Sequence, residues 1–187
     1  QAKRQVFRTI CQAQADAFEI SQRTRSVLET TADLYATLNR TLKDLGGTQE
    51  QSAELTELIN QSFRITGGGA AAMDGAIRQL NQAFSSGTLR GDEFNSVMDQ
   101  APRLQRALTD ALGVTKGELR AMAEEGKLSS EIVINALLSQ KQAISAEFAQ
   151  IAPTIGGAFQ QIENSWLKFL GQLDESKGAS AAVAASL

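Results

Sequence analysis

The stretch LGVTKGELRAMAEEGKLSSE, residues 112–131, carries the signals for ending one helix, forming a second and starting a third. Gly113 and Gly126 follow amphipathic runs, at the place where a left-handed residue closes the last helical turn. Thr115 and Glu118 have the spacing of a capping box, in which each side chain accepts a hydrogen bond from the backbone N–H of the other residue. The stretch therefore predicts short helices joined by tight corners.

The same corner occurs earlier in the chain. Residues 87–92, GTLRGD, repeat the form of residues 126–131, GKLSSE: a cap glycine, a polar residue, a leucine, two linking residues and an acid. The leucine is expected to fill the angle between two helices, and Asp92 or Glu131 to complement the positive end of the next helix dipole. We interpret the pair as an internal repeat of a helix corner and assign no functional site to either copy.

Apolar residues recur at three- and four-residue steps along most of the chain, which is typical of amphipathic helices. Two helices are predicted before Gly46, with the polar residues 21–26 either as a joint or as part of one uninterrupted helix. A capping box at Thr48 and Gln51 begins the next helix, which the glycines at 67–69 end. Further helices are predicted at residues 70–84, 92–100, 102–112, 116–124, 130–151 and, after Pro153, 155–173.

The composition favours an all-α fold, since only 5% of residues are aromatic and just two are proline. We predict a compact bundle of short helices at about residues 84–152, with longer flanking N-terminal and C-terminal amphipathic helices. The predicted domains are N-terminal long helices at 1–47, a helical domain at 48–152, and at 153–187 an amphipathic helix followed by the start of a longer, truncated segment. The predicted core of the bundle consists of Phe84, Phe94, Leu104, Leu108, Leu119, Met122, Val133 and Leu137.

The residue inventory argues against several classes of function. With no histidine, the chain lacks the commonest general base and metal ligand. Cys11 is the only cysteine, and its apolar helical setting predicts a small buried side chain. The net charge of −3 provides no attraction for nucleic acid or anionic lipid, and no apolar run approaches a membrane span. We therefore expect no enzyme, no catalytic residues, no cofactor, no metal, and no nucleic-acid or membrane partner.

The last predicted helix carries the strongest candidate for a functional surface, because its apolar face needs something to cover it. Two readings stay open: the helix folds back on the rest of the chain, or it offers this face to a partner. The predicted interaction face consists of Phe159, Ile162, Trp166, Phe169, Leu170 and Leu173.

Residues 80–138 resemble the tape measure domain found near the start of many bacteriophage and prophage tail tape measure proteins. The similarity is dense in this segment, weaker from 46 to 79, and fades elsewhere into generic helix. Each matching element is a helix cap, a hydrophobic staple (an apolar contact across the start of a helix) or a helix corner. No catalytic residue is therefore carried over. The matching segments are LRGDEF (89–94), QAP (100–102), LGV (112–114), GEL (117–119), MAEEGKLSSE (122–131) and AL (136–137).

The resemblance implies a structural role rather than an activity. Such proteins are very long and mostly helical, they occupy the lumen of the tail tube, and their length sets the number of tube rings. Because an extended helix advances about 1.5 Å per residue, chain length converts directly into distance. The present stretch is broken too often to be the ruler itself, so the hypothesis is a folded terminal module that anchors it.

The partners implied by the resemblance are tail proteins of the tube, the tip or an assembly chaperone, together with self-association. The implied locations are the interior of the virion tail and, during assembly, the cytoplasm of the bacterial host. The alternative function is a bacterial helical adaptor, or an interaction module of a secreted effector, that converged on similar corners.

Overall fold

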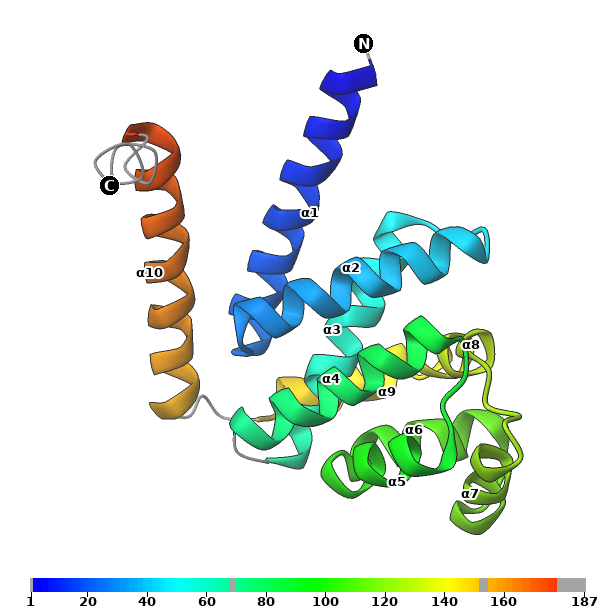
Figure 1. Cartoon of the computed structure of the whole chain (residues 1–187). Helices are drawn as coiled ribbons and strands as arrows, with labels where there is room; N and C mark the ends of the chain where they lie inside the picture. The colour runs from blue at the N-terminus through cyan, green and yellow to red at the C-terminus, as the bar shows by residue number, and fades with distance from the viewer. Residues whose placement is uncertain (1, 68–69, 152–154, 178–187) are drawn as a thin grey trace.

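The computed structural model describes residues 2–67, 70–151 and 155–177, with side chains for 12–67, 71–151 and 156–172. Within these ranges the chain forms α-helices and no β-strand, which confirms the all-α prediction (Figure 1). Cys11 lies outside the described side chains. The helices are α1 (Ala2–Thr24), α2 (Leu28–Asp44), α3 (Gln49–Thr66), α4 (Ala70–Ser86), α5 (Gly91–Gln100), α6 (Pro102–Leu112), α7 (Lys116–Glu124), α8 (Ser130–Ser139), α9 (Lys141–Ala149) and α10 (Ile155–Lys177).

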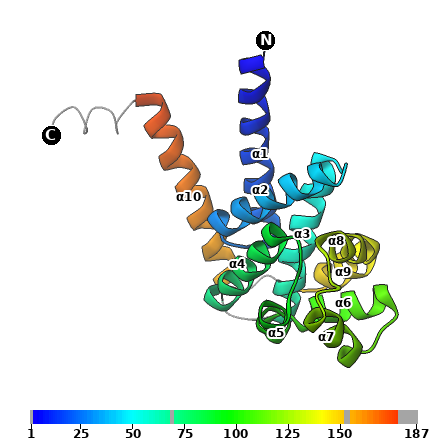
Figure 2. The same ribbon diagram turned by 45° about the vertical axis from the view of Figure 1, so that its right-hand side comes forward.

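Helix α3 lies at the centre of the molecule, where it packs against α1, α2, α6, α8 and α9 (Figures 1 and 2). Its apolar side, including Leu55, Ile59 and Phe63, is completely buried. These side chains belong to one continuous core that extends from Leu34 in α2 to Ile144 in α9. Burial of each leucine-sized side chain contributes about 1.5–3 kcal/mol, so this core is the main source of stability.

The predicted core residues are placed as expected, with one exception. Met122 is only partly buried and packs at the edge of the core. The others are 4% exposed or less: Phe84, Phe94, Leu104, Leu108, Leu119, Val133 and Leu137.

The two repeated corners pair with each other. Gly87 and Gly126 have left-handed backbones, with φ of 84° and 69°. The Leu89 amide donates to the Leu128 carbonyl at 2.9 Å, and the amide of Ser130 donates to the carbonyl of Gly87 at 2.9 Å. Both leucines are buried, as the corner pattern predicts. The repeat therefore forms a small two-fold-like clasp between the α4–α5 and α7–α8 connections, which the pattern of either corner alone does not reveal.

The capping signals also place the helix ends correctly. Both predicted capping boxes are present: Thr48 with Gln51 begins α3, and Thr115 with Glu118 begins α7. The hydrogen bonds from the Thr115 backbone and side chain lower the pKa of the exposed Glu118 carboxyl.

The polar segment near residue 25 is a joint rather than the middle of one long helix. Helix α1 ends at Thr24, and Arg25 takes a left-handed φ of 55° before α2 begins at Leu28. A non-glycine residue in this conformation costs about 1 kcal/mol, so the surrounding contacts must hold the joint in place.

One predicted helix is wrong: residues 130–151 form two helices, α8 and α9, that meet at Gln140. The turn lets α8 pack on α6 while α9 runs along α3. Glu147 of α9 then accepts hydrogen bonds from Arg103 and Arg106 of α6 at 2.5 and 2.7 Å. No glycine or proline marks the break, because tertiary packing produces it.

Two glycines in the α6–α7 region allow the role of a glycine helix cap to be tested against a matched control. Gly113 has a φ of 66°, whereas Gly117 lies in the first turn of α7 and an added Cβ would meet nothing within 4 Å. Gly113→Ala should lower the free energy of unfolding by about 1–2 kcal/mol, because alanine resists the left-handed conformation. Gly117→Ala should raise it by about 0.5 kcal/mol. Urea denaturation measures both, and equal effects would contradict the assignment of Gly113 as the cap.

Asp16 of α1 links the first three helices through its Oδ2 atom. It accepts a hydrogen bond from the Tyr35 hydroxyl of α2 at 3.0 Å and from the Gln49 side chain of α3 at 3.1 Å. Burial, followed by the hydrogen bond to the Asp16 carboxylate, raises the pKa of Tyr35 to about 12.

This raised pKa gives a pH dependence that can be checked with the single tyrosine of the chain. A phenol with a higher pKa in the folded state contributes stability that is fully present below pH 10 and is lost as the pH rises toward 12. Phenolate absorbance should therefore titrate near 12 in the folded protein and near 10 in denaturant. Tyr35→Phe should remove this part of the alkaline loss of stability, and a folded-state midpoint near 10 would contradict the contact with Asp16.

Candidate interaction surface on helix α10

Helix α10 is held against α1 and the α1–α2 joint by the side chain of Asn164, which is completely buried. Its amide nitrogen donates to the Ser21 hydroxyl at 3.3 Å and to the Ser26 carbonyl at 2.8 Å. Its amide oxygen accepts from the backbone N–H of Leu28, the first residue of α2, at 3.2 Å. One amide thus bonds to the end of α1, to the joint and to the start of α2.

The rest of the docked side of α10 is also polar. Gln22 and Gln161 exchange hydrogen bonds, each side-chain amide donating to the backbone carbonyl of the other at 3.0 and 2.9 Å. Gln22 also donates to the Ser165 hydroxyl at 2.8 Å. One turn further on, the Lys168 ammonium lies 3.9 Å from the centre of the Phe18 ring, a cation–π contact. Helix α10 is therefore attached mainly through amides and a cation.

Behind the joint, a second buried amide extends the polar network. Asn60 of α3 donates to the Thr24 and Thr31 hydroxyls at 3.3 and 3.0 Å. The Thr24 hydroxyl donates in turn to the Ile20 carbonyl at 2.7 Å. These side chains are no more than 1% exposed, so the hydrogen bonds that they form replace bonds to water, whereas the amide oxygen of Asn60 is buried without a hydrogen-bond partner.

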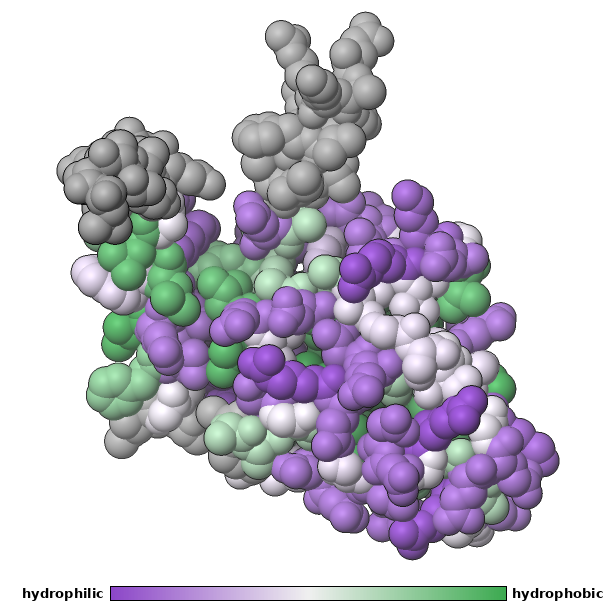
Figure 3. Space-filling view, viewed as in Figure 1, coloured by the Kyte–Doolittle hydropathy of each residue, from purple (hydrophilic) through white to green (hydrophobic). Residues whose placement is uncertain are grey.

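The predicted interaction face points away from this docked side. In the space-filling view, apolar side chains gather over α10 (Figure 3). The ring centres of Trp166 and Phe169 lie 5.6 Å apart. Leu173 lies outside the described side chains. The exposed fractions of the other predicted residues are 67% for Phe159, 65% for Ile162, 57% for Trp166, 48% for Phe169 and 44% for Leu170.

The arrangement combines features of both readings of this helix. Its polar side folds back on the body, while the apolar side stays open to solvent. Part of the open side forms a shallow hollow of about 690 Å³ that includes Ile162, Trp166 and Phe169. The assignment of the face as an interaction site stays a prediction.

Two other hollows are less suited to a ligand. A groove of about 640 Å³ lies between the end of α2 and the paired corners, and its lining includes Arg40, Asp44 and several serine hydroxyls. The mixture of charges and hydroxyls defines no ligand class. Leu45, 47% exposed, is the large apolar side chain at its rim.

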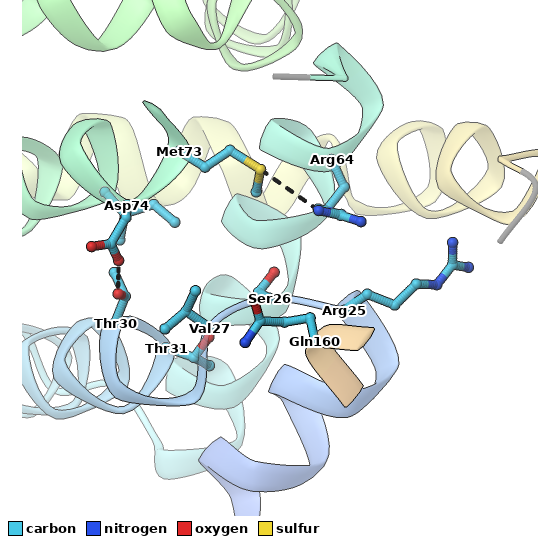
Figure 4. A pocket seen from close by; sticks show the side chains of 10 residues that line it. Arg25, Ser26, Val27, Thr30, Thr31, Arg64, Met73, Asp74 and Gln160 are labelled. Atoms are coloured by element: carbon cyan, nitrogen blue, oxygen red, sulfur yellow. Dashed lines mark hydrogen bonds between the residues drawn. The ribbon is translucent and has the colours of Figure 1, made fainter. Parts of the chain in front are cut away.

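The second hollow is a cavity of about 10 Å³ beside the α1–α2 joint, with room for about one water molecule (Figure 4). On its walls Thr30 donates to the carboxylate of Asp74, and Arg64 donates to the Met73 sulfur at 4.0 Å. Burial, with a smaller contribution from the charge of Arg25, lowers the pKa of Arg64. The cavity is too small for a cofactor or an organic substrate.

Neither metal nor membrane chemistry is indicated by the part of the chain that the structure describes. No group of three or more cysteine, aspartate or glutamate side chains there is arranged to bind a metal ion. None of the described helices has the length and apolarity needed to cross a membrane.

The sequence predicted the apolar face but not the polar docking contact. Gln22, Asn60 and Asn164 lie on helix faces that are equally consistent with exposure to water. The available signal was the run of polar residues at 21–26, which offered a joint as one of two alternatives and gave no indication of its partner on α10.

The docking contact predicts the effect of removing the Asn164 amide. Asn164→Ala should release α10, because Ser21 and Ser26 each lose a hydrogen bond at a buried site and Leu28 loses one at a part-buried site. The Leu28 amide should then exchange with deuterium more than about tenfold faster, corresponding to a loss of at least about 1.4 kcal/mol. The control is Gln172→Ala, which shortens another amide side chain at an exposed position of the same helix. Equal exchange in both variants would contradict the role of Asn164.

Comparison with known proteins connects this architecture to a family. A family model described as "Tape measure protein" matches residues 8–175. The chain is 24% identical over 130 residues to the "Probable tape measure protein" of Escherichia phage Mu, an alignment that covers 70% of this chain and 19% of that protein. The chain thus spans about a fifth of the length of this curated relative. No solved structure matches it.

The family match covers both terminal helices, α1 from residue 8 and α10 to residue 175, as well as the paired corners. It therefore includes the exposed face of α10 and not only the segment around the corners. The chain belongs to the tape measure protein family, whose members are structural components of phage tails.

Proposed function

We propose that this chain is an assembly module of a phage tail tape measure protein, with a part in tail length determination and tail tube assembly. The observation that carries the proposal is the family match over residues 8–175, which includes a folded body and an exposed apolar helix face. The match favours this role over the alternative of a bacterial adaptor or secreted effector. The proposed locations are the interior of the virion tail and, during assembly, the cytoplasm of the bacterial host.

The module itself is poorly suited to measure length. A ruler must extend along the tail, whereas helices α2 to α9 fold back on one another around α3. The longest helices are α1 and α10, each of 23 residues, or about 35 Å. Their free ends lie on the same side of the body (Figures 1 and 2). The body is thus suited to anchor longer segments of the whole protein at one end.

In this proposal the exposed face of α10 makes the contacts with other proteins during assembly. A contiguous apolar patch of this kind usually marks a binding surface in a soluble protein. The proposed partners belong to the tail: the tube, the tip or an assembly chaperone, together with further copies of the protein.

The division of the chain into residues 1–47, 48–152 and 153–187 stays a prediction. Leu34 and Leu38 of α2 lie in the same core as α3, so residues 1–47 also contribute to the folded body.

A deletion in the parent phage or prophage distinguishes an anchoring module from a stretch of ruler. Removal of residues 91–124, which comprise α5 to α7, should prevent assembly of normal tails because it takes Leu104, Leu119 and their neighbours out of the core and exposes the rest of it. If the region were part of an extended ruler, the same deletion would shorten the tail by about 50 Å. Electron microscopy of tails gives the answer.

The matched control is a deletion of equal length in a helical part of the tape measure protein beyond this chain. That change should yield intact tails that are shorter by about 50 Å. Uniformly shortened tails from both deletions would refute the proposal that the module is an anchor.

A further inference from the structure

Four of the exposed apolar residues of α10 have the spacing of a coiled-coil seam. Phe159, Ile162, Trp166 and Phe169 follow one another at intervals of three, four and three residues, and the sequence extends the pattern by four to Leu173. Alternation of three and four is the heptad repeat, in which these residues occupy the a and d positions.

In this register the docked side lies opposite the seam. Asn164 and Gly157 occupy f positions, at the back of the helix; Asn164 is completely buried against the body, and Gly157 is also buried. The polar contacts therefore fix the rotation of α10 about its own axis, with the a and d side chains directed away from the body.

We propose that the partner of this seam is α10 of a second copy of the chain, paired with it as a coiled coil. The proposal rests on the proposed function, since it names the partner of the face assigned there to assembly.

The exposed area is sufficient for a reversible contact between two copies. Side chains of this size have surfaces of about 150–250 Å², so the exposed fractions of the five described face residues leave roughly 500–600 Å² open on each copy. Two copies would bury roughly 1,100 Å², at the lower limit of a specific interface. This area favours concentration-dependent pairing rather than a permanent dimer.

The positions that flank the seam also accept an identical helix. The e and g positions from 158 to 172 are Ala158, Glu163, Ser165, Leu170 and Gln172, which include one charge. In a parallel pair, Glu163 of one copy faces Ala158 of the other, so no like charges meet. The nearby cation, Lys168, is already placed over Phe18 on the body side.

The test uses the 187-residue chain, whose only tryptophan occupies a seam position. As concentration rises, sedimentation should show the mass increase from one copy toward two, and Trp166 emission should shift to shorter wavelength over the same range. The two signals must change together, because pairing removes the indole from water. A monomer with constant emission at every concentration would overturn the proposal.

Two glutamate substitutions on the same exposed helix distinguish pairing through the seam from non-specific hydrophobic association. Ile162→Glu places like charges at a d position and should weaken pairing by about a hundredfold or more. Leu167→Glu changes an equally apolar side chain, 48% exposed, at a b position outside the seam, and should leave pairing unchanged. Both sites are exposed, so thermal unfolding should show both variants folded. Equal weakening by the two substitutions would contradict the seam.

Phage assays distinguish failure of this inference from failure of the proposed function. If the purified chain stays monomeric but Ile162→Glu still blocks tail assembly, the face serves a different tail protein and only the pairing is refuted. If the chain pairs as described but the deletion of residues 91–124 simply shortens tails, the pairing holds and the anchoring role fails.

Discussion

Enclosure of α3 on nearly all sides is the constraint on which the rest of the molecule depends. Its neighbours α1, α2, α6, α8 and α9 exclude water from a helix that carries several polar side chains. Thr56 and Ser62 meet this constraint locally, because their hydroxyls donate to backbone carbonyls one turn earlier at 2.7 and 2.8 Å. The longer amides need partners elsewhere: Gln61 accepts a hydrogen bond from Ser145 of α9. Polar residues on the central helix thus determine which helices must surround it.

The position of α10 follows from the same constraint. Asn60 bonds to Thr24 and Thr31, which stabilises the sharp joint between α1 and α2. The joint leaves the Ser26 carbonyl and the Leu28 amide available, and Asn164 bonds to both. Because an amide needs defined directions for its hydrogen bonds, this contact specifies the orientation of α10 more closely than an apolar contact would. An exposed apolar face is therefore a consequence of how the polar side is held.

The features predictable from sequence were those encoded by neighbouring residues. Glycine caps, capping boxes and the two leucine corners depend on interactions within a few positions, and the structure contains each of them. The break at Gln140 and the bond of Glu147 to Arg103 and Arg106 depend on packing between distant segments, so no local pattern marks them. For the same reason the apolar stripe of α10 was visible, but the docking role of Asn164 was not. A regular spacing of apolar residues indicates that a helix has an apolar face that needs to be covered. It does not specify which face of the helix packs against the rest of the protein.

The clasp between Leu89 and Leu128 has a consequence for how the chain folds. Helices α5, α6 and α7 have only 9 to 11 residues each, well below the length at which an isolated helix is stable in water. We expect these helices to gain stability only after the two corners meet and close the loop between them. Closing this loop costs conformational entropy, and contacts within the single helices are too few to offset that cost. Folding of this region is therefore expected to be all-or-none, with no smaller stable intermediate inside it. During synthesis, α5, α6 and α7 would therefore not be stably folded until the ribosome has delivered α8.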